Sequence, residues 1–501
     1  MPAFNNDQYL REQTQHIMER VGTSGQRLYL EFGGKLIGDF HAARVLPGFD
    51  PNVKMRLLQN LAANADIIIC IHAGDIERKK IRADLGITYD NDALRLIDDL
   101  RNRNVNIAGV VITRFNGQPS ALDFKRRLEK YGIGVFLHRE IAGYPDNFDY
   151  IVSENGFGSN PYIPVKQPLV VVTGPGPNSG KMGTCLSQIY HEYRLGNQAH
   201  YAKFETFPVW NLPLNHPVNI AYEAATADLQ DANALDHFHY DAHGIVSVNY
   251  NRDLQAFPLL KSLLTRITGK ECPYQSPTDM GVNCIASGIV DDAAVSEAAR
   301  LEIARRYFRI KADYMLGRAE ETTFNRIVEI IGKSKVDPEQ RDVVVAAREA
   351  AKEGAERDKG NMDIHCGAAI KTPDGTIITG KNSPLMHAAA ATFLNAAKHL
   401  AGIADSQHLL LPDILEAVAN FKAGLGSRRQ SSLNLTETLI TLVASSNRDK
   451  YAQDAIGCMS LFQQCDMHLT HIPSTGDEDG LRRLGINYTY DPVKATKNLF
   501  K

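Results

Sequence analysis

The stretch Leu169-Val170-Val171-Val172-Thr173-Gly174-Pro175-Gly176-Pro177-Asn178-Ser179-Gly180-Lys181-Met182-Gly183-Thr184 joins an apolar run to a glycine-rich loop and a helical segment. The apolar run predicts a buried strand over residues 169–173, and the pattern after Gly180 predicts a helix to residue 195. Glycines allow backbone amides to converge, and a helix N-terminus adds unsatisfied amides and the positive end of a dipole. The stretch therefore predicts a phosphate-binding loop, with ligand contacts from Gly174, Gly176, Asn178, Ser179, Gly180, Lys181 and Thr184.

The spacing of this loop departs from the common nucleotide-binding pattern. Five residues separate Gly174 from Gly180, and Met182 stands where that pattern places a Ser or Thr after the lysine. Thr184 lies two positions further on, about 200° around a helix, so it does not simply inherit the magnesium contact. We expect ATP or another nucleoside phosphate as the ligand, with Mg²⁺ as a candidate companion. Whether the loop holds a whole nucleotide or only an anion stays open.

Composition limits the class of protein. With 501 residues, 44% of them hydrophobic, the chain can form several cores, and its net charge of -3 without a long basic run argues against a nucleic-acid partner. The N-terminal segment is polar and no apolar run is long enough to span a membrane, so we expect a cytoplasmic protein without a membrane partner. The seven cysteines lack Cys-x-x-Cys spacing and are expected to be reduced thiols.

Short apolar runs alternate with amphipathic segments between residues 27 and 251, which predicts an α/β fold with a doubly wound, mostly parallel sheet. The expected strands are residues 27–36, 65–73, 105–114, 134–138, 169–173, 200–204 and 244–250, and the expected helices include 91–103, 120–131 and 180–195. Helical periodicity continues over residues 291–332 and 338–356. We divide the chain into an N-terminal α/β unit (1–165), an α/β unit with the glycine loop (166–290), a helical connector (291–356) and a C-terminal α/β domain (357–501).

A resemblance to a known family rests on several stretches, including residues 168–192, 222–229, 248–253 and 276–283. In these the chain resembles an uncharacterised bacterial family catalogued as domain of unknown function 1846, also called uncharacterised protein family 0371. The resemblance implies no established activity. Some members of that family carry an automatic label of ATP-dependent zinc protease. In this chain His191-Glu192-Tyr193-Arg194-Leu195 has leucine where a zincin needs its second histidine, so we expect no zincin protease.

Three further residue groups in the first half are candidates for catalysis, beside Lys181. Lys203 and Glu205 lie at the carboxyl end of an expected strand, where open α/β sheets place their ligands. This order of glycine loop, helix and strand is similar to that of dethiobiotin-synthetase-like ligases. Asp228, with Glu223, Thr226 and Asp231, offers carboxylates for magnesium or for positioning a nucleophile, or else a solvated helix face. Arg252 next to Asp253 suits recognition of a carboxylate or phosphate, or else a structural salt bridge.

Residues 236–243 contain Asp236, His237, His239, Asp241 and His243, a density that suits a transition metal or proton transfer. The simpler interpretation is a hydrated polar loop. The turn at residues 276–281 suits either an oxyanion-binding loop or an ordinary connection.

The C-terminal part resembles the hairpin and helix of the cytidine-deaminase fold, on Gly367-Ala368-Ala369-Ile370, Asp374-Gly375 and the helix that opens at His387. The helix of that fold carries a zinc-binding histidine and, two residues later, a glutamate that shuttles protons, and the resemblance implies the same pair here. Here Ala389 replaces the glutamate, and Pro412-Asp413-Ile414-Leu415-Glu416 replaces the expected Pro-Cys-x-x-Cys. We therefore expect no zinc and favour a metal-free scaffold. The alternative is a harder site for manganese, iron or magnesium made by His387, Asp413 and Glu416.

Together these features favour an enzyme that uses a nucleoside phosphate to activate a small anionic metabolite, in the manner of a ligase or kinase. Lys181 and the loop amides would stabilise charge on the transferring phosphoryl group. We expect a homo-oligomer, because candidate carboxylates lie far from the loop in the sequence. One alternative is a non-catalytic metabolite-binding or assembly protein with degenerate folds. The other is a metal-dependent enzyme of the C-terminal domain.

Overall fold

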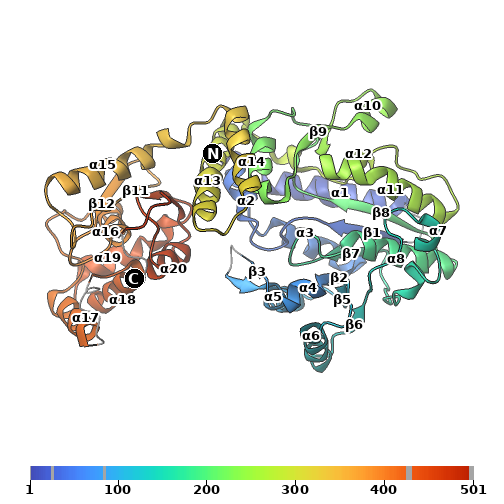
Figure 1. The fold of residues 1–501 in the computed structure, drawn as a ribbon, viewed down its shortest axis with the longest axis horizontal. Helices are drawn as coiled ribbons and strands as arrows, with labels where there is room; N and C mark the ends of the chain where they lie inside the picture. Colours follow the sequence, from blue (N-terminus) through green and yellow to red (C-terminus); the bar gives the residue numbers. More distant parts are fainter. Residues whose placement is uncertain (1, 24–26, 83–85, 425–431, 496–501) are drawn as a thin grey trace. The chain divides into compact units, whose positions relative to one another are not determined.

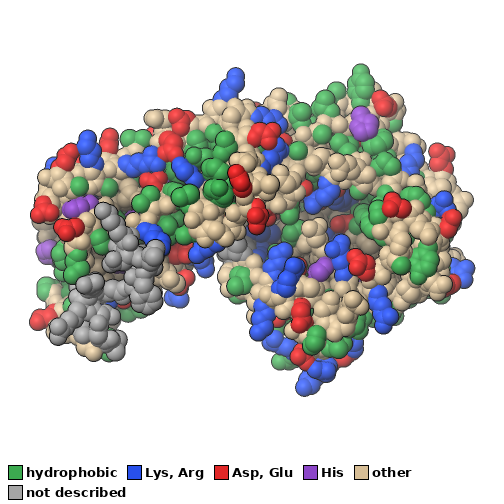
Figure 2. All heavy atoms as spheres, in the orientation of Figure 1, with side chains coloured by type: hydrophobic (Ala, Val, Ile, Leu, Met, Phe, Trp, Pro, Cys, Tyr) green, Lys and Arg blue, Asp and Glu red, His purple; other side chains and the backbone are tan. Residues whose placement is uncertain are grey.

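The computed structural model describes residues 2–23, 27–82, 86–424 and 432–495. The chain forms two compact units (Figure 1). The N-terminal unit comprises Met1–Thr226 with Asp231–Ala299, and the C-terminal unit comprises Ala227–Gln230 with Arg300–Lys501. No helix in the described ranges is both long enough and apolar enough to cross a membrane. On the face that Figure 2 shows, Lys and Arg side chains are interspersed with Asp and Glu.

A parallel sheet of six strands organises the N-terminal unit. The strand order is β6-β5-β2-β7-β1-β8. The strands are β1 (Arg27–Phe32), β2 (Ala65–His72), β5 (Ile107–Thr113), β6 (Val135–Leu137), β7 (Leu169–Thr173) and β8 (Ala199–Phe204). Six of the seven predicted strands thus lie in this sheet, with β7 at the predicted bounds. The α/β fold class with a parallel sheet is confirmed.

The central strands are mostly apolar because helices cover both faces of the sheet. On one face, α8 (Lys181–Arg194) and α11 (Asn251–Thr268) pack through Cys185, Ile189 and Leu260 onto Val170 and Val172. The chain passes from β1 to β2 in one direction along the sheet and from β7 to β8 in the other. Right-handed crossovers therefore send these two connections to opposite faces. At the carboxyl ends of β7 and β1 the chain connections therefore diverge to opposite faces, and open α/β sheets usually place their ligands at such a point.

The other elements of the N-terminal unit surround the sheet. Its remaining helices are α1 (Asn6–Thr23), α2 (Phe40–Val45), α3 (Val53–Leu61), α4 (Ala73–Glu77), α5 (Tyr89–Arg101), α6 (Pro119–Lys130), α7 (Phe148–Ile151), α9 (Pro217–Ala225), α10 (His237–His243) and α12 (Pro277–Met280). Two short antiparallel pairs are β3 (Ile81–Arg82) with β4 (Ile87–Thr88), and β9 (Asn233–Leu235) with β10 (Val248–Tyr250). The strand predicted over residues 244–250 is therefore shorter, and it pairs with β9 instead of joining the main sheet.

The C-terminal unit has a four-stranded sheet in the order β12-β11-β13-β14. Its strands are β11 (Gly367–Lys371), β12 (Ile377–Lys381), β13 (Asp466–Leu469) and β14 (Asn487–Tyr490). Its helices are α14 (Glu321–Ser334), α15 (Asp342–Glu356), α16 (Ala388–Ala401), α17 (Pro412–Gly424), α18 (Leu435–Ser446), α19 (Lys450–Gly457) and α20 (Thr475–Arg483), and α13 (Asp292–Met315) leads into the unit. The antiparallel β11–β12 pair confirms the predicted hairpin.

The predicted segment boundaries fall within these units. Strands from both sides of residue 165 share the six-stranded sheet, and residues 300–356 cluster with the C-terminal unit. The four-segment division stays a prediction about which parts fold independently.

Candidate functional site

The glycine loop connects β7 to α8 at the centre of the sheet. Its backbone turns through Asn178 and Gly180, whose φ angles of 56° and 84° lie in the left-handed region. At Gly174 a Cβ atom would come within 2.3 Å of the Cys70 carbonyl oxygen, because the loop lies directly against the end of β2. From β5, the Thr113 hydroxyl donates to the Ser179 carbonyl at 2.8 Å. The neighbouring strands therefore fix the loop and require its glycines.

The loop and the first turn of α8 keep their backbone donors available. Within the described chain, no amide from residue 178 to 183 donates a hydrogen bond to a protein acceptor. The hydroxyls of Thr173 and Ser179 are buried and also have no partner among the described residues. Lys181 stands at the first position of α8 and is half-buried. A concentration of unsatisfied donors beside a lysine is an environment that favours an anion.

Thr184 does not face the mouth of the loop. Its hydroxyl donates to the Gly180 carbonyl at 3.0 Å and lies 3.4 Å from the Cys70 sulfur, and the residue is buried. Since the hydroxyl is already bonded to backbone one turn earlier, it does not point to where a phosphate-bound magnesium ion would sit. The predicted ligand contact of Thr184 therefore receives no support from its position.

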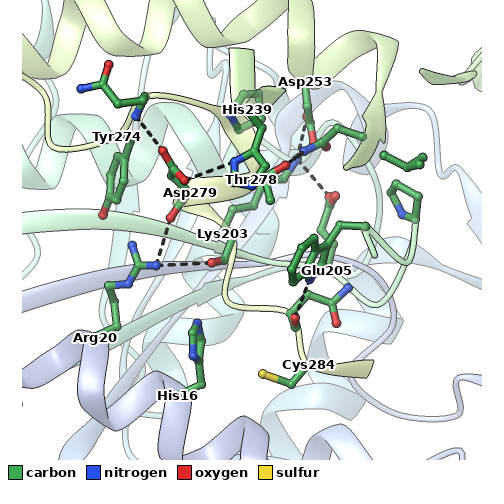
Figure 3. Close-up of a pocket in the computed structure, with 18 of the residues that line it drawn as sticks. His16, Arg20, Lys203, Glu205, His239, Asp253, Tyr274, Thr278, Asp279 and Cys284 are labelled. Atoms are coloured by element: carbon green, nitrogen blue, oxygen red, sulfur yellow. Dashed lines mark hydrogen bonds and ion pairs between the residues drawn. The ribbon is translucent and has the colours of Figure 1, made fainter. Parts of the chain in front are cut away.

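A cavity of about 810 Å³ opens beside the edge strand β8 and reaches past its carboxyl end (Figure 3). Its walls come from α1, β8, α10, α11 and α12, and include the aromatic rings of Phe207, Trp210 and Tyr274. The turn predicted at residues 276–281 forms α12 and then runs beside β8, where the Val282 amide donates to the Lys203 carbonyl at 3.0 Å. The turn thus covers the edge of the sheet, two strands away from the glycine loop.

Lys203 and Glu205 both line this cavity, as do Asp253, considered from the sequence together with Arg252, and Asp279 from the predicted turn at residues 276–281. The Lys203 ammonium donates to the two carboxylate oxygens of Asp253 at 2.7 and 2.6 Å. It also lies 3.1 Å from the nearer oxygen of Glu205. Asp253 follows β10 in the first turn of α11, and only the packing of α11 on the sheet brings it to Lys203.

In this cluster, burial and neighbouring opposite charges shift the pKa values in opposite directions. Burial alone would lower the pKa of Lys203, but the carboxylates of Asp253, Glu205 and Glu31 raise it above its ordinary value. Burial raises the pKa of Glu205 to about 7 despite the opposing charge of Lys203. Lys203 is therefore a permanent cation, and Glu205 exchanges a proton near neutral pH.

Another part of the cavity lining consists of Arg20 and the imidazoles of His16 and His200. Arg20 donates to the Asp279 carbonyl at 2.9 Å. Burial lowers the pKa of His16 and of His200, and the nearby charge of Arg20 lowers both further. These imidazoles are thus neutral donors and acceptors at physiological pH, and Arg20 is the cation on this wall.

The glycine loop and the cavity are separate sites on one edge of the sheet. Strand β1 lies between β7, which carries the loop, and β8, which lines the cavity, so these two strands are two strand spacings, about 10 Å, apart. Between them, the buried carboxylate of Glu31 on β1 accepts a hydrogen bond from the Tyr201 hydroxyl at 2.7 Å. Lys203 and Glu205 therefore lie in the cavity, and no residue of the loop is among those that line it.

Two of the predicted catalytic residues lie outside both sites. Arg252 donates to the buried carboxylate of Asp231 at 3.2 Å, which is the structural salt bridge weighed as an alternative. Asp228 is exposed in the short 3-10 turn Ala227–Leu229. The neighbouring carboxylate of Glu223 is buried and accepts the amide of Asn233 at 3.1 Å.

The structure does not bring together the proposed C-terminal metal ligands. His387 caps the N-terminus of α16, and its Nδ1 lies 2.6 Å from the buried carboxylate of Asp477. Asp413 accepts a hydrogen bond from Arg448 at 2.6 Å on the surface, and Glu416 is exposed. Among the described residues, only His239, His243 and Asp279 place three such ligand atoms within 4.8 Å of one another.

Comparison with known proteins agrees with the resemblance stated from the sequence. Residues 2–335 match the family model for the N-terminal domain of unknown function DUF1846, and residues 339–500 match the model for its C-terminal domain. A UPF0371 protein of Clostridium botulinum (strain Langeland) is 51% identical over 500 residues, which cover 99% of both chains. A UPF0371 protein of Clostridioides difficile (strain 630) is 49% identical over 501 residues, again 99% of each. The chain is a member of the DUF1846 family, whose function is unknown.

Proposed function

We propose that this protein is an enzyme that binds a nucleoside phosphate in the glycine loop and uses it to activate a small anionic metabolite held in the adjacent cavity. The observation that carries the proposal is the set of unbonded amides from residue 178 to 183, next to Lys181 and the buried hydroxyl of Ser179. A phosphate group supplies acceptors for all of these donors at once.

The position of the loop supports the same conclusion. It follows a central strand of a parallel sheet, at the point where the direction of the chain connections reverses. The strand that carries the loop, β7, and the strand that lines the cavity, β8, lie only two strand spacings, about 10 Å, apart. A nucleotide anchored by one phosphate group at the loop can therefore present a terminal phosphoryl group toward β8.

The residues present suit phosphoryl transfer to an anionic acceptor. The loop amides and Lys181 would stabilise the negative charge that develops on the transferring group. In the cavity, Lys203 and Arg20 offer two cations for the anionic group of the metabolite. Glu205 changes protonation near neutral pH, so it is suited to accept a proton from the attacking group.

Calorimetric titration of the full-length protein with ATP, GTP and inorganic phosphate tests the loop. We expect binding that weakens at least about tenfold in Lys181→Ala, since one charged hydrogen bond is worth about 1.5–3 kcal/mol. Lys130→Ala, which removes an exposed lysine at the end of α6, is the matched control and should leave the affinity unchanged. An absence of binding by the wild type, or equal affinity in Lys181→Ala, would remove the proposed function.

For the C-terminal unit we propose a deaminase-like scaffold without catalytic metal. The support is the hairpin β11–β12 followed by α16, and the use of His387 in a hydrogen bond to Asp477. We expect the metal content of the purified protein to be the same in wild type and His387→Ala. A loss of stoichiometric metal in that variant would instead favour the metal-dependent alternative.

A further inference from the structure

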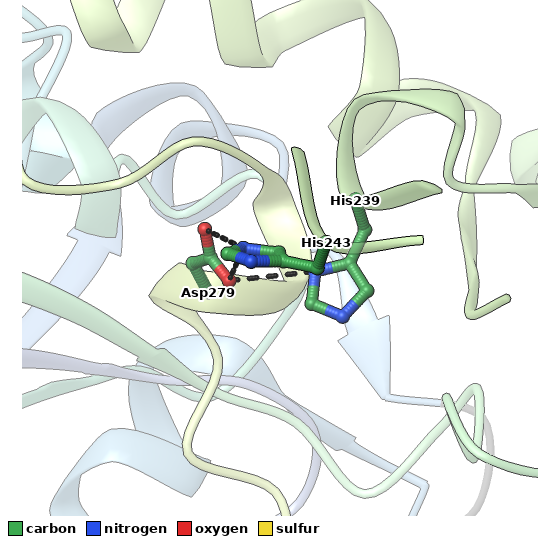
Figure 4. Close-up of side chains that lie close together, drawn as sticks. All are labelled: His239, His243 and Asp279. Atoms are coloured by element: carbon green, nitrogen blue, oxygen red, sulfur yellow. Dashed lines mark hydrogen bonds and ion pairs between the residues drawn. The ribbon is translucent and has the colours of Figure 1, made fainter. Parts of the chain in front are cut away.

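Two imidazoles and one carboxylate converge on a single point in the cavity wall (Figure 4). His239 and His243 lie one turn apart on α10, and Asp279 comes from α12. The Nε2 of His243 lies 3.0 Å from Oδ1 of Asp279, and the Nδ1 of His239 lies 3.4 Å from the same oxygen. We propose that these three side chains bind a divalent first-row transition-metal ion.

Two of the three spacings between the ligand atoms fit such an ion, and the two imidazole nitrogens lie within 4.8 Å of each other. Bonds of about 2.0–2.2 Å in tetrahedral geometry place neighbouring ligand atoms about 3.3–3.5 Å apart. The distances of 3.0 and 3.4 Å from the two imidazole nitrogens to the carboxylate oxygen lie close to this range. Two nitrogens with one oxygen are a donor set typical of zinc, iron, manganese or cobalt, whereas magnesium and calcium prefer oxygen alone.

The groups around the three residues already hold them in position. The Gln275 amide donates to Oδ2 of Asp279 at 2.9 Å. The Nε2 of His243 also lies 3.1 Å from Oδ2, so Oδ1 is the oxygen that both imidazoles share. The Ser276 hydroxyl lies 2.9 Å from Nδ1 of His239 and also accepts the Asp279 amide at 3.0 Å. A bound ion would replace the first of these serine contacts and leave the second. Such hydrogen bonds to the ligands orient a metal site and strengthen it.

The metal site faces the cavity, so its remaining coordination positions are open to a ligand there. All three residues line the cavity together with two other carboxylates, Glu205 and Asp253, and the two cations Lys203 and Arg20. With all these groups ionised, the cavity carries a formal charge of minus one. A divalent ion changes this to plus one, and it supplies a direct bond to a carboxylate or phosphate oxygen. The identification of the cavity ligand as an anion rests on the proposed function, whereas the metal site itself does not.

Titration of the full-length, chelator-treated protein with Zn²⁺, followed by calorimetry, tests the site. We expect about one equivalent to bind to the wild type. His243→Ala and Asp279→Asn should each weaken binding at least about tenfold, because even changes around metal ligands cost 10–100-fold. His237→Ala is the matched control, since it removes an exposed histidine from the same helix and should leave the affinity unchanged. Circular dichroism establishes that each variant is folded, and Asp279→Asn keeps the shape of the side chain.

Three results would overturn the proposal. They are the absence of stoichiometric Zn²⁺ binding by the wild type, unchanged affinity in both His243→Ala and Asp279→Asn, and a loss of binding in His387→Ala. The two proposals fail separately. Zn²⁺ binding that persists while no nucleotide binds removes only the nucleotide proposal, and nucleotide binding sensitive to Lys181→Ala without Zn²⁺ binding removes only the metal site.

Discussion

Replacing Glu205 with glutamine should change how the stability of the N-terminal unit depends on pH. The side chain of Glu205 is 25% exposed, and burial raises its pKa from 4.5 to about 7. Between these two values the folded protein holds a proton that the unfolded chain has released. Because the folded state binds more protons in this window, the stability of the wild type falls as the pH rises through it.

The size of the effect follows from the two pKa values. Relative to a protonated carboxyl, Glu205 lowers the free energy of unfolding by less than about 1 kcal/mol at pH 5 and by about 3 kcal/mol at pH 8. Glutamine resembles the protonated carboxyl in shape and does not titrate. The stability advantage of Glu205→Gln over the wild type should therefore grow by about 2–3 kcal/mol from pH 5 to pH 8.

Urea unfolding followed by fluorescence measures this difference. The chain contains one tryptophan, Trp210, which lines the same cavity and so reports on the N-terminal unit. Glu140→Gln, at an exposed position of that unit, is the control and should match the wild type at each pH. If the stability difference between Glu205→Gln and the wild type were the same at pH 5 and pH 8, the protonation of Glu205 near neutral pH would be refuted.

Four further substitutions test particular contacts by unfolding measurements. Gly180→Ala should destabilise the N-terminal unit by about 1–2 kcal/mol, because its φ of 84° is left-handed and a Cβ would lie 2.8 Å from the Thr113 side chain. Gly183→Ala, in an exposed helical position with open space around it, should instead be neutral or stabilising by up to about 1 kcal/mol. Glu192→Gln should lower the free energy of unfolding by about 3 kcal/mol, since this fully buried carboxylate pairs with an arginine and accepts two tyrosine hydroxyls, each at 2.8 Å. A decrease of less than about 1 kcal/mol would show that the charge of Glu192 does not hold these partners together. Asp477→Asn should lower the midpoint of thermal unfolding of the C-terminal unit, measured by circular dichroism. The reason is that this buried carboxylate accepts hydrogen bonds from the Leu435 amide at 2.8 Å and the Ser474 hydroxyl at 2.7 Å. An unchanged midpoint would show that these hydrogen bonds contribute little to stability.

The sequence predicted the elements that depend on neighbouring residues. The apolar run of β7, the glycine loop and α8 occur where the pattern placed them, and so does the hairpin of β11 and β12. The family was also recognisable from short stretches alone. Strand periodicity and glycine positions are local properties, so a single sequence carries them without knowledge of the fold.

The tertiary structure decided which distant residues meet. The sequence indicated that Lys203 and Glu205 lie at the end of a strand, but only the order of the sheet separates them from the glycine loop by β1. In the same way Asp253 reaches Lys203, 50 residues away, and Asp279 reaches His243, 36 residues away. Such pairs are selected by helix packing and by strand order, which are set by the burial of apolar surface over the whole unit. No local pattern near either residue records these pairs. The sequence indicated His239 and His243 as candidates for a metal, but only the folded chain joined them to Asp279 and placed them in the cavity.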